Sequence, residues 1–63
     1  MPETIPVILA RRGWKPSDLA YEARLSYSVI SNAINGQKIS EKTARKICKA
    51  LKMDLKDIDG LNY

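Results

Sequence analysis

A short polar segment in the middle of the chain carries the side chains best suited to binding chemistry. Apolar positions recur with helical spacing over residues 26–35, so we expect a helix with one buried face. The other face carries hydroxyl and amide groups and no charge, at Tyr27, Ser28, Ser31 and Asn32. Such a face offers hydrogen-bond donors and acceptors without long charged arms, which matches the edges of base pairs in the major groove of DNA.

This surface has other interpretations. Tyr27 is predicted to hydrogen-bond a base or a phosphate, or to touch a thymine methyl group, or else to pack half-buried over a turn. Asn32 either pairs with adenine or is a solvated amide. The whole face could simply be solvated, but solvated helix faces usually carry Lys and Glu, the best helix formers, and this one has neither. The composition of the face therefore favours DNA contact.

The core side of this helix is less sharply defined by the sequence. Either Val29 or Ile30, and either Ala33 or Ile34, is expected to point inward.

The charge of the chain is unevenly distributed. The net charge is +4, from 11 basic and 7 acidic residues. Residues 37–52 hold six cations and one acid, whereas three aspartates lie within the last ten residues. This balance favours a polyanionic partner without proving one. For Lys46, Lys49 and Lys56 we favour a role in solubility.

Several classes of function are disfavoured by composition. With one cysteine and no histidine, the chain cannot form an internal disulfide, and we expect no metal site and no cofactor. It has no nucleophile–base motif and no glycine-rich phosphate loop, so we expect no enzyme. The longest apolar stretch, residues 7–10, is too short to span a bilayer, and no secretory signal is visible. We therefore expect a cytoplasmic protein, with Cys48 as a buried small hydrophobe.

Helix start and stop signals predict five short helices, which must position these side chains. Helices are expected over residues 5–12 and 16–23, over residues 26–35, and after Ser40 and Asp54. Gly13 and Gly36 are expected to end the first and third helices. Four of the five starts combine an apolar residue before the N-cap with another at the fourth helical position. No segment shows strand alternation, so we predict a compact all-α domain over residues 1–63, with its core at about 5–61.

Four segments together resemble the helix-turn-helix family of phage repressors and Cro, also called the XRE family. They are GWKPSDLA at residues 13–20, LSYSVIS at 25–31, AING at 33–36 and ALKMDL at 50–55. The resemblance covers about residues 5–61. It implies a five-helix fold like that of lambda repressor, sequence-specific binding to double-stranded DNA, and transcriptional repression, with residues 26–35 as the recognition helix.

The resemblance also implies where DNA phosphates bind. The loop after the recognition helix and the start of the next helix are expected to hold them, because helix N-termini bind anions and cations release condensed counterions. The expected phosphate contacts are Lys15, Ser17, Ser26, Asn35, Gln37, Lys38, Ser40, Lys42 and Thr43.

The chain departs from the family pattern at several positions. Arg24 and Lys52 stand where the family has helix-ending glycines, so each is expected to adopt a positive φ at some energetic cost. Lys15 replaces a capping serine, and Pro16 replaces a glutamine that usually contacts a phosphate. Lys15 or Ser17 is expected to take over that contact.

A further departure concerns an ion pair. Many relatives pair an arginine in the first helix with a glutamate near the end of the third, and the corresponding residues here are Leu9 and Ile34. Because both halves are apolar, neither leaves a bare buried charge.

The assembly state is predicted from the size of the site. One recognition helix covers too few base pairs to find a single genomic site, so we expect a palindromic operator with two half-sites. The candidate dimer surface is small, comprising Leu55, Leu61 and Tyr63, which predicts a monomer or a weak homodimer in solution. The alternative function is a protein-interaction module on the same fold, without salt-dependent DNA affinity.

Overall fold

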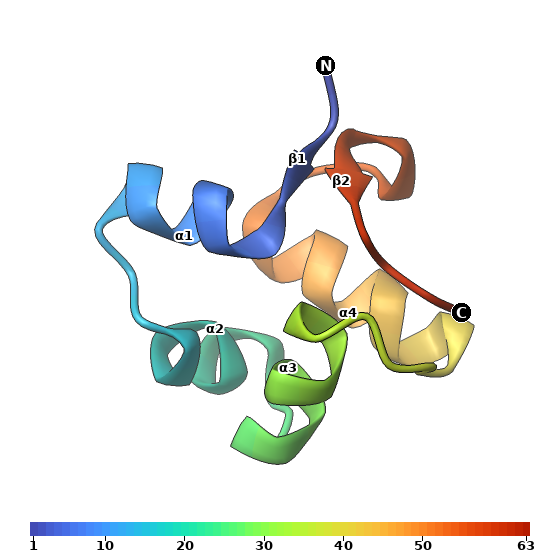
Figure 1. Cartoon of the computed structure of the whole chain (residues 1–63). Helices are drawn as coiled ribbons and strands as arrows, with labels where there is room; N and C mark the ends of the chain where they lie inside the picture. The colour runs from blue at the N-terminus through green and yellow to red at the C-terminus, as the bar shows by residue number, and fades with distance from the viewer.

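The chain folds into four α-helices, one short 3₁₀ turn and a two-stranded sheet (Figure 1). The computed structural model describes residues 1–63. The elements are β1 (Glu3–Thr4), α1 (Ile5–Arg12), α2 (Pro16–Ala23), α3 (Tyr27–Ile34), α4 (Glu41–Leu51), η1 (Leu55–Asp57) and β2 (Ile58–Asp59). Helix α2 packs against both α3 and α4. Three residues join α2 to α3, as expected for a helix-turn-helix pair.

The first four predicted helices are confirmed, together with most of their end signals. The Oγ atoms of Ser26 and Ser40 accept hydrogen bonds from the N–H groups of Val29 and Thr43 at 3.3 and 3.1 Å, which satisfies one otherwise unpaired donor at each helix start. Gly13 ends α1 in the left-handed conformation at φ 70°. Local capping chemistry therefore fixes these boundaries.

The start of α2 is better capped than its N-cap residue predicts. Lys15 offers no side-chain acceptor, but its backbone N–H donates to a carboxylate oxygen of Asp18 at 2.7 Å. Asp18 also places a negative charge in the first turn, where it interacts favourably with the positive end of the helix. The half of the capping box supplied from the third helical position is thus kept without a capping serine.

The prediction of a fifth helix is wrong. After Asp54 the chain makes only the three-residue turn η1, closed by a hydrogen bond from the Asp57 N–H to the Asp54 carbonyl at 2.9 Å. The Asp54 N–H in turn donates to the Asp57 carboxylate at 3.2 Å. Ile58 then adopts an extended conformation, with φ −114° and ψ 121°, and begins β2. Strand β2 pairs in parallel with β1, with Glu3 opposite Ile58. This sheet, which the sequence does not predict, joins the two ends of the chain, and the extended backbone that it requires from Ile58 ends the turn.

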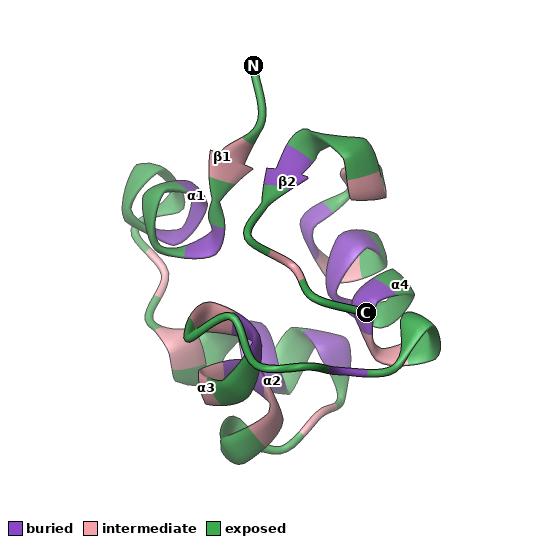
Figure 2. Ribbon diagram, turned by 45° about the vertical axis from the view of Figure 1, so that its right-hand side comes forward, coloured by how far each residue is buried: buried purple, intermediate pink, exposed green.

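The core lies between the inner faces of the helices and is wholly apolar. Figure 2 shows buried segments on the inner sides of α1, α2 and α4, whereas most outer surfaces are exposed. No polar or charged residue is buried, and no buried polar side-chain atom lacks a partner. The largest fully buried side chains are Ile5, Leu19, Ile30, Ile47 and Leu51.

One arginine joins the ends of two helices. The guanidinium of Arg12 lies 5.5 Å from the centre of the Trp14 ring, within the range of a cation–π interaction. Arg12 also donates a hydrogen bond to the carbonyl of Leu51, the last residue of α4. Because the last carbonyls of a helix lack partners within the helix, this contact satisfies one of them. Arg12 therefore connects the end of α1 with the end of α4 and packs over the Trp14 ring, which is itself half-buried against the core.

The structure confirms the expected backbone conformation at the two departures from glycine. Arg24 ends α2 and Lys52 ends α4, each with φ 57°, and no other non-glycine residue has a positive φ. This conformation costs a residue with a side chain on the order of 1 kcal/mol. A cation at a helix C-terminus returns about 0.3–1 kcal/mol, so the charge offsets the strain only in part.

We expect Arg24→Gly to be more stable than Arg24→Ala by about 1 kcal/mol. Both changes remove the cation, but only glycine relieves the strain at φ 57°. For a domain of this size such a difference corresponds to roughly 4–8 °C in melting temperature. Thermal unfolding followed by circular dichroism measures it, and the same comparison applies to Lys52. Equal melting temperatures for the glycine and alanine variants would contradict the prediction.

Candidate nucleic-acid interface

Helix α3 lies at the surface, with one face in the core and the other in solvent. Ile30 and Ala33 are the buried residues, at 0% and 2% exposure, whereas Val29 and Ile34 are half-buried. The ambiguity left by the sequence is thereby resolved, and the solvent face carries the polar side chains.

The four side chains predicted to contact bases are unequally available. Tyr27 is the first residue of α3 and is 59% exposed, and Ser28 and Asn32 are also exposed. The side chains of these three residues form no hydrogen bond within the chain. Ser31 is half-buried, and its hydroxyl accepts a hydrogen bond from the amide of Asn35 at 3.5 Å. Three of the four residues thus keep all of their hydrogen-bonding capacity for a ligand.

The loop after α3 is held by the last residues of the chain, an arrangement that the sequence does not predict. The N–H of Ile39 donates to the carbonyl of Asn62 at 2.7 Å, and the amide of Asn62 donates to the carbonyl of Gly36 at 3.3 Å. Lys38 and Asn62 also form a parallel β-bridge. Asn62 is therefore a positioning residue for the loop that carries Gln37 and Lys38, both of which are exposed.

The N-terminus of α4 presents backbone donors beside this loop. The N-cap hydroxyl of Ser40 accepts from the Thr43 N–H and donates to Thr43 Oγ1 at 2.8 Å. Ser40 is thus fully engaged locally, whereas Thr43 keeps its own hydroxyl proton to donate. The N–H groups of Glu41 and Lys42 form no backbone hydrogen bond. Free donors at a helix N-terminus are suited to an anion such as a phosphate.

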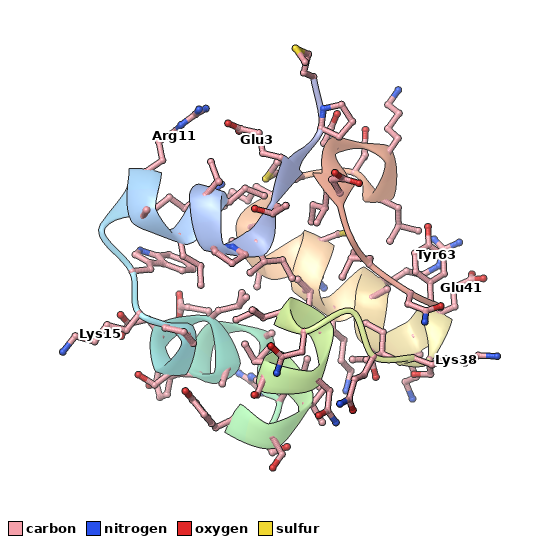
Figure 3. The ribbon with its side chains drawn as sticks, viewed as in Figure 1. Glu3, Arg11, Lys15, Lys38, Glu41 and Tyr63 are labelled. Carbon is pink, nitrogen blue, oxygen red and sulfur yellow. The ribbon has the colours of Figure 1, made fainter.

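The predicted phosphate contacts form two groups on either side of the molecule. Figure 3 shows the side chains of Lys15 and Lys38 extending in opposite directions. Ser17, in the first turn of α2, is exposed near Lys15, whereas Asn35 and Lys42 are exposed on the other side, after α3. A groove of DNA has a phosphate backbone on each side, so donors on both flanks of α3 suit a helix inserted in the major groove. Ser26 Oγ is engaged in capping α3.

Few of the cations are neutralised within the chain. The two ion pairs are Glu3 with Arg11, at the end of the molecule opposite α3, and Glu41 with Arg45 at 2.9 Å. Lys15, Lys38 and Lys42 have no acidic partner. The charge on both flanks of α3 is therefore free to attract a polyanion.

The cysteine, which lies in α4, is buried, as the sequence predicts. Cys48 is 6% exposed, and burial raises the pKa of its thiol, with the nearby carboxylate of Asp54 acting in the same direction. A raised pKa keeps the thiol protonated at neutral pH, and the protonated thiol is a poor nucleophile.

The surface considered for dimerisation is mostly used by the core. Leu55 and Leu61 are half-buried and pack against the core cluster, whereas Tyr63 remains 48% exposed. Tyr63 follows Asn62 and therefore lies next to the loop after α3.

The two apolar replacements for the family's ion pair lie in the same part of the molecule. Leu9 is 3% exposed in α1, and Ile34, the last residue of α3, packs half-buried against the core cluster that contains Leu9.

No group of three or more His, Cys, Asp or Glu side chains is placed to hold a metal ion. None of the helices has both the length and the apolar character needed to cross a membrane.

The family of the chain follows from a comparison with known proteins. A family model described as a Cro/C1-type HTH DNA-binding domain matches residues 4–62. The comparisons with curated proteins and with solved structures gave no match. The matched range contains all four α-helices, the short link between α2 and α3, and the exposed polar face of α3. The chain therefore belongs to the Cro/C1-type helix-turn-helix DNA-binding domains.

Proposed function

We propose that the chain is a sequence-specific transcriptional repressor that forms one domain over residues 1–63 and reads the major groove of double-stranded DNA with α3. The observation that carries the proposal is the solvent face of α3. Its side chains Tyr27, Ser28 and Asn32 are uncharged and form no hydrogen bond within the chain. They lie between two groups of side chains that are suited to binding anions. Phosphate contacts fix the orientation of a protein on DNA, and base contacts supply the specificity. The exposed polar face of α3 and the cations on its two flanks support these two roles.

The proposed roles follow from the chemistry of each group. Ser28 and Asn32 hydrogen-bond base edges, Tyr27 contacts a base or a neighbouring thymine methyl group, and Ser31 contributes a weaker contact because it already accepts from Asn35. The phosphates bind on one side to residues at the start of α2 and on the other to the loop after α3 and the first turn of α4. The proposed phosphate contacts are Lys15, Ser17, Ser26, Asn35, Gln37, Lys38, Ser40, Lys42 and Thr43. To donate to a phosphate, the Ser40 hydroxyl exchanges its hydrogen bond to Thr43 Oγ1 for one to a phosphate oxygen.

Selection from random duplex DNA at a fixed, stated salt concentration tests the proposal directly. We expect one enriched motif, and we expect the protein to bind it more tightly than scrambled DNA of equal length. Absence of an enriched motif, together with affinity that hardly changes with salt, would instead favour a protein-interaction module on this fold.

The phosphate contacts make a quantitative prediction. We expect Lys38→Ala and Lys42→Ala each to weaken binding to all duplexes alike and to reduce the slope of log affinity against log salt by roughly one. Lys56→Ala is the matched control, since Lys56 is an exposed lysine in η1, away from α3. Titrations by fluorescence anisotropy at several salt concentrations measure the slopes. Identical slopes for Lys38→Ala and Lys56→Ala would exclude Lys38 from the phosphate contacts.

The assembly state forms part of the proposal. We expect a monomer or weak dimer in free solution that pairs on a palindromic operator, because Leu55 and Leu61 are largely used by the core. Sedimentation with and without the selected duplex measures the stoichiometry. Tyr63→Glu, which changes an exposed residue, is expected to weaken pairing on DNA. A tight dimer without DNA, or 1:1 binding to a palindrome that Tyr63→Glu leaves unaltered, would contradict this expectation.

A further inference from the structure

A basic cleft lies between the C-terminal ends of α2 and α4, outside the surface described above. Its volume is about 560 Å³, and its lining includes four cations, Arg24, Lys46, Lys49 and Lys52. Two alanines and Glu22 complete the lining, so four positive charges and one negative charge leave a net +3. No residue of α3 takes part. We call this feature the basic cleft.

The cations of the basic cleft are not neutralised within the chain. None of the four forms an ion pair or a side-chain hydrogen bond, even with Glu22, which lines the same cleft. Arg45, on the same helix, does pair with a carboxylate, that of Glu41. The concentrated charge of the cleft is therefore open to a ligand.

Backbone strain converges on the same cleft. Arg24 and Lys52 are the only non-glycine residues with positive φ, and both line it. Strained positions of this kind cluster at functional sites. Cations near helix C-termini also stabilise the helix ends, but Lys46 lies more than a turn before the end of α4 and is not accounted for in this way. The helix dipole therefore does not explain the whole group.

The lining of the cleft indicates the chemistry of its ligand. A bound protein segment usually requires a large apolar or aromatic anchor at the centre of the interface, and the only apolar residues here are two alanines. Phosphates of DNA require only positive charge, because binding is driven by the release of condensed counterions. Phosphates therefore fit the cleft better than an acidic peptide does.

The cleft is continuous with the predicted phosphate contacts. Lys42, Lys46 and Lys49 follow one another at i, i+4 and i+7 along α4, so they share one helix face. The 11 residues of α4 span roughly 16 Å, from the loop after α3 to the cleft. We propose that the basic cleft binds backbone phosphates of a DNA segment outside the site read by α3. The inference rests on the proposed DNA-binding function and extends the contacts beyond the recognition site.

The test compares Lys49→Ala with Lys56→Ala, two exposed lysines whose loss changes the charge equally. Affinities are measured over a range of salt on a short duplex containing only the selected site and on a longer duplex with added flanks. We expect Lys49→Ala to reduce the salt slope on the longer duplex by roughly one and to leave the short duplex unaffected. If the cleft instead binds phosphates of a separate DNA molecule, wild type is expected to bind a second short duplex at high DNA concentration. Lys49→Ala is then expected to bind only one.

A second pair of variants distinguishes loss of the cation from loss of the folded state. Arg24→Gly and Lys52→Gly relieve strain, so each is expected to melt above its alanine counterpart and yet to reduce binding of the longer duplex as Lys49→Ala does. Folded protein with weaker binding then isolates the loss of the cation.

The remaining outcomes overturn the inference in distinguishable ways. If wild type binds no DNA, the proposed function fails and the inference fails with it. If wild type binds the selected site but the cleft variants behave like Lys56→Ala, the inference alone fails. Equal losses on short and long duplexes would make the cleft part of the site read by α3. If the cleft variants lose a binding to poly-glutamate that wild type shows, and their DNA binding is unaltered, the ligand of the cleft would be an acidic protein.

Discussion

Leu9→Arg alone is expected to unfold most of the protein. Leu9 is 3% exposed within an apolar core that contains no charged residue, so the guanidinium would be buried without a partner. An uncompensated buried charge destabilises a fold by about 3–5 kcal/mol. A chain of this length has a total stability of only a few kcal/mol, roughly 3–5. Thermal or urea unfolding followed by circular dichroism measures the loss.

The matched control and the rescue make this prediction specific. Val7→Arg places the same charge on the same helix at a residue that is 46% exposed, and we expect little change in stability. Adding Ile34→Glu to Leu9→Arg is expected to recover much of the loss, because the carboxylate then pairs with the guanidinium. If the double variant instead loses the sum of the two single losses, the two positions are not in contact.

Asn32→Ala and Ser28→Ala are expected to have the largest effects on DNA recognition. Each removes one hydrogen-bonding contact with a base edge and lowers the preference for the selected sequence by about 1–3 kcal/mol, which is roughly five- to more than a hundredfold. Binding to scrambled DNA is expected to change little, since phosphate contacts dominate it. Competition titrations with selected and scrambled duplexes measure the ratio.

Tyr21→Ala serves as the control for these variants. Tyr21 is 82% exposed, but it lies on α2 and not on the solvent face of α3, so its loss is expected to leave the preference unaltered. Repeating the random-sequence selection with the variants shows which base positions relax. An unaltered motif with both Asn32→Ala and Ser28→Ala would mean that α3 does not read the bases.

The features that the sequence predicts correctly depend on neighbouring residues. Ser26 and Ser40 each cap a helix by accepting from an N–H group three positions along the chain. Gly13 ends α1 and directly follows its last residue, Arg12. The positive φ of Arg24 and Lys52 is expected from the resemblance to the family, which has glycines at these two positions, and the structure has it at both. The solvent face of α3 is likewise predicted, since helical spacing alone decides which side chains share a face.

The features that the sequence does not predict connect distant parts of the chain. Strands of two residues carry no periodicity, so the pairing of Glu3 with Ile58 leaves no pattern to detect. The hydrogen bond from Asn62 to Gly36 joins residues 26 positions apart, and the one from Arg12 to Leu51 joins residues 39 apart. Lys46 and Lys49 in α4, with Lys52 at its C-cap, have the spacing of an ordinary solvated face, and only the position of Arg24 reveals the cleft.

The attachment of the loop after α3 to Asn62 links the dynamics of the segment around Asn62 to DNA binding. A segment held by only a few hydrogen bonds opens with little free energy. The Ile39 amide is protected only while its hydrogen bond to Asn62 is formed, so it is expected to exchange with solvent deuterium at the rate at which the last residues detach. A duplex that holds the loop would oppose this detachment and slow the exchange, although it touches neither Asn62 nor Tyr63. Ordering of the C-terminal end would then form part of the free energy of binding, and a modification of the last two residues would alter affinity through entropy rather than through contact.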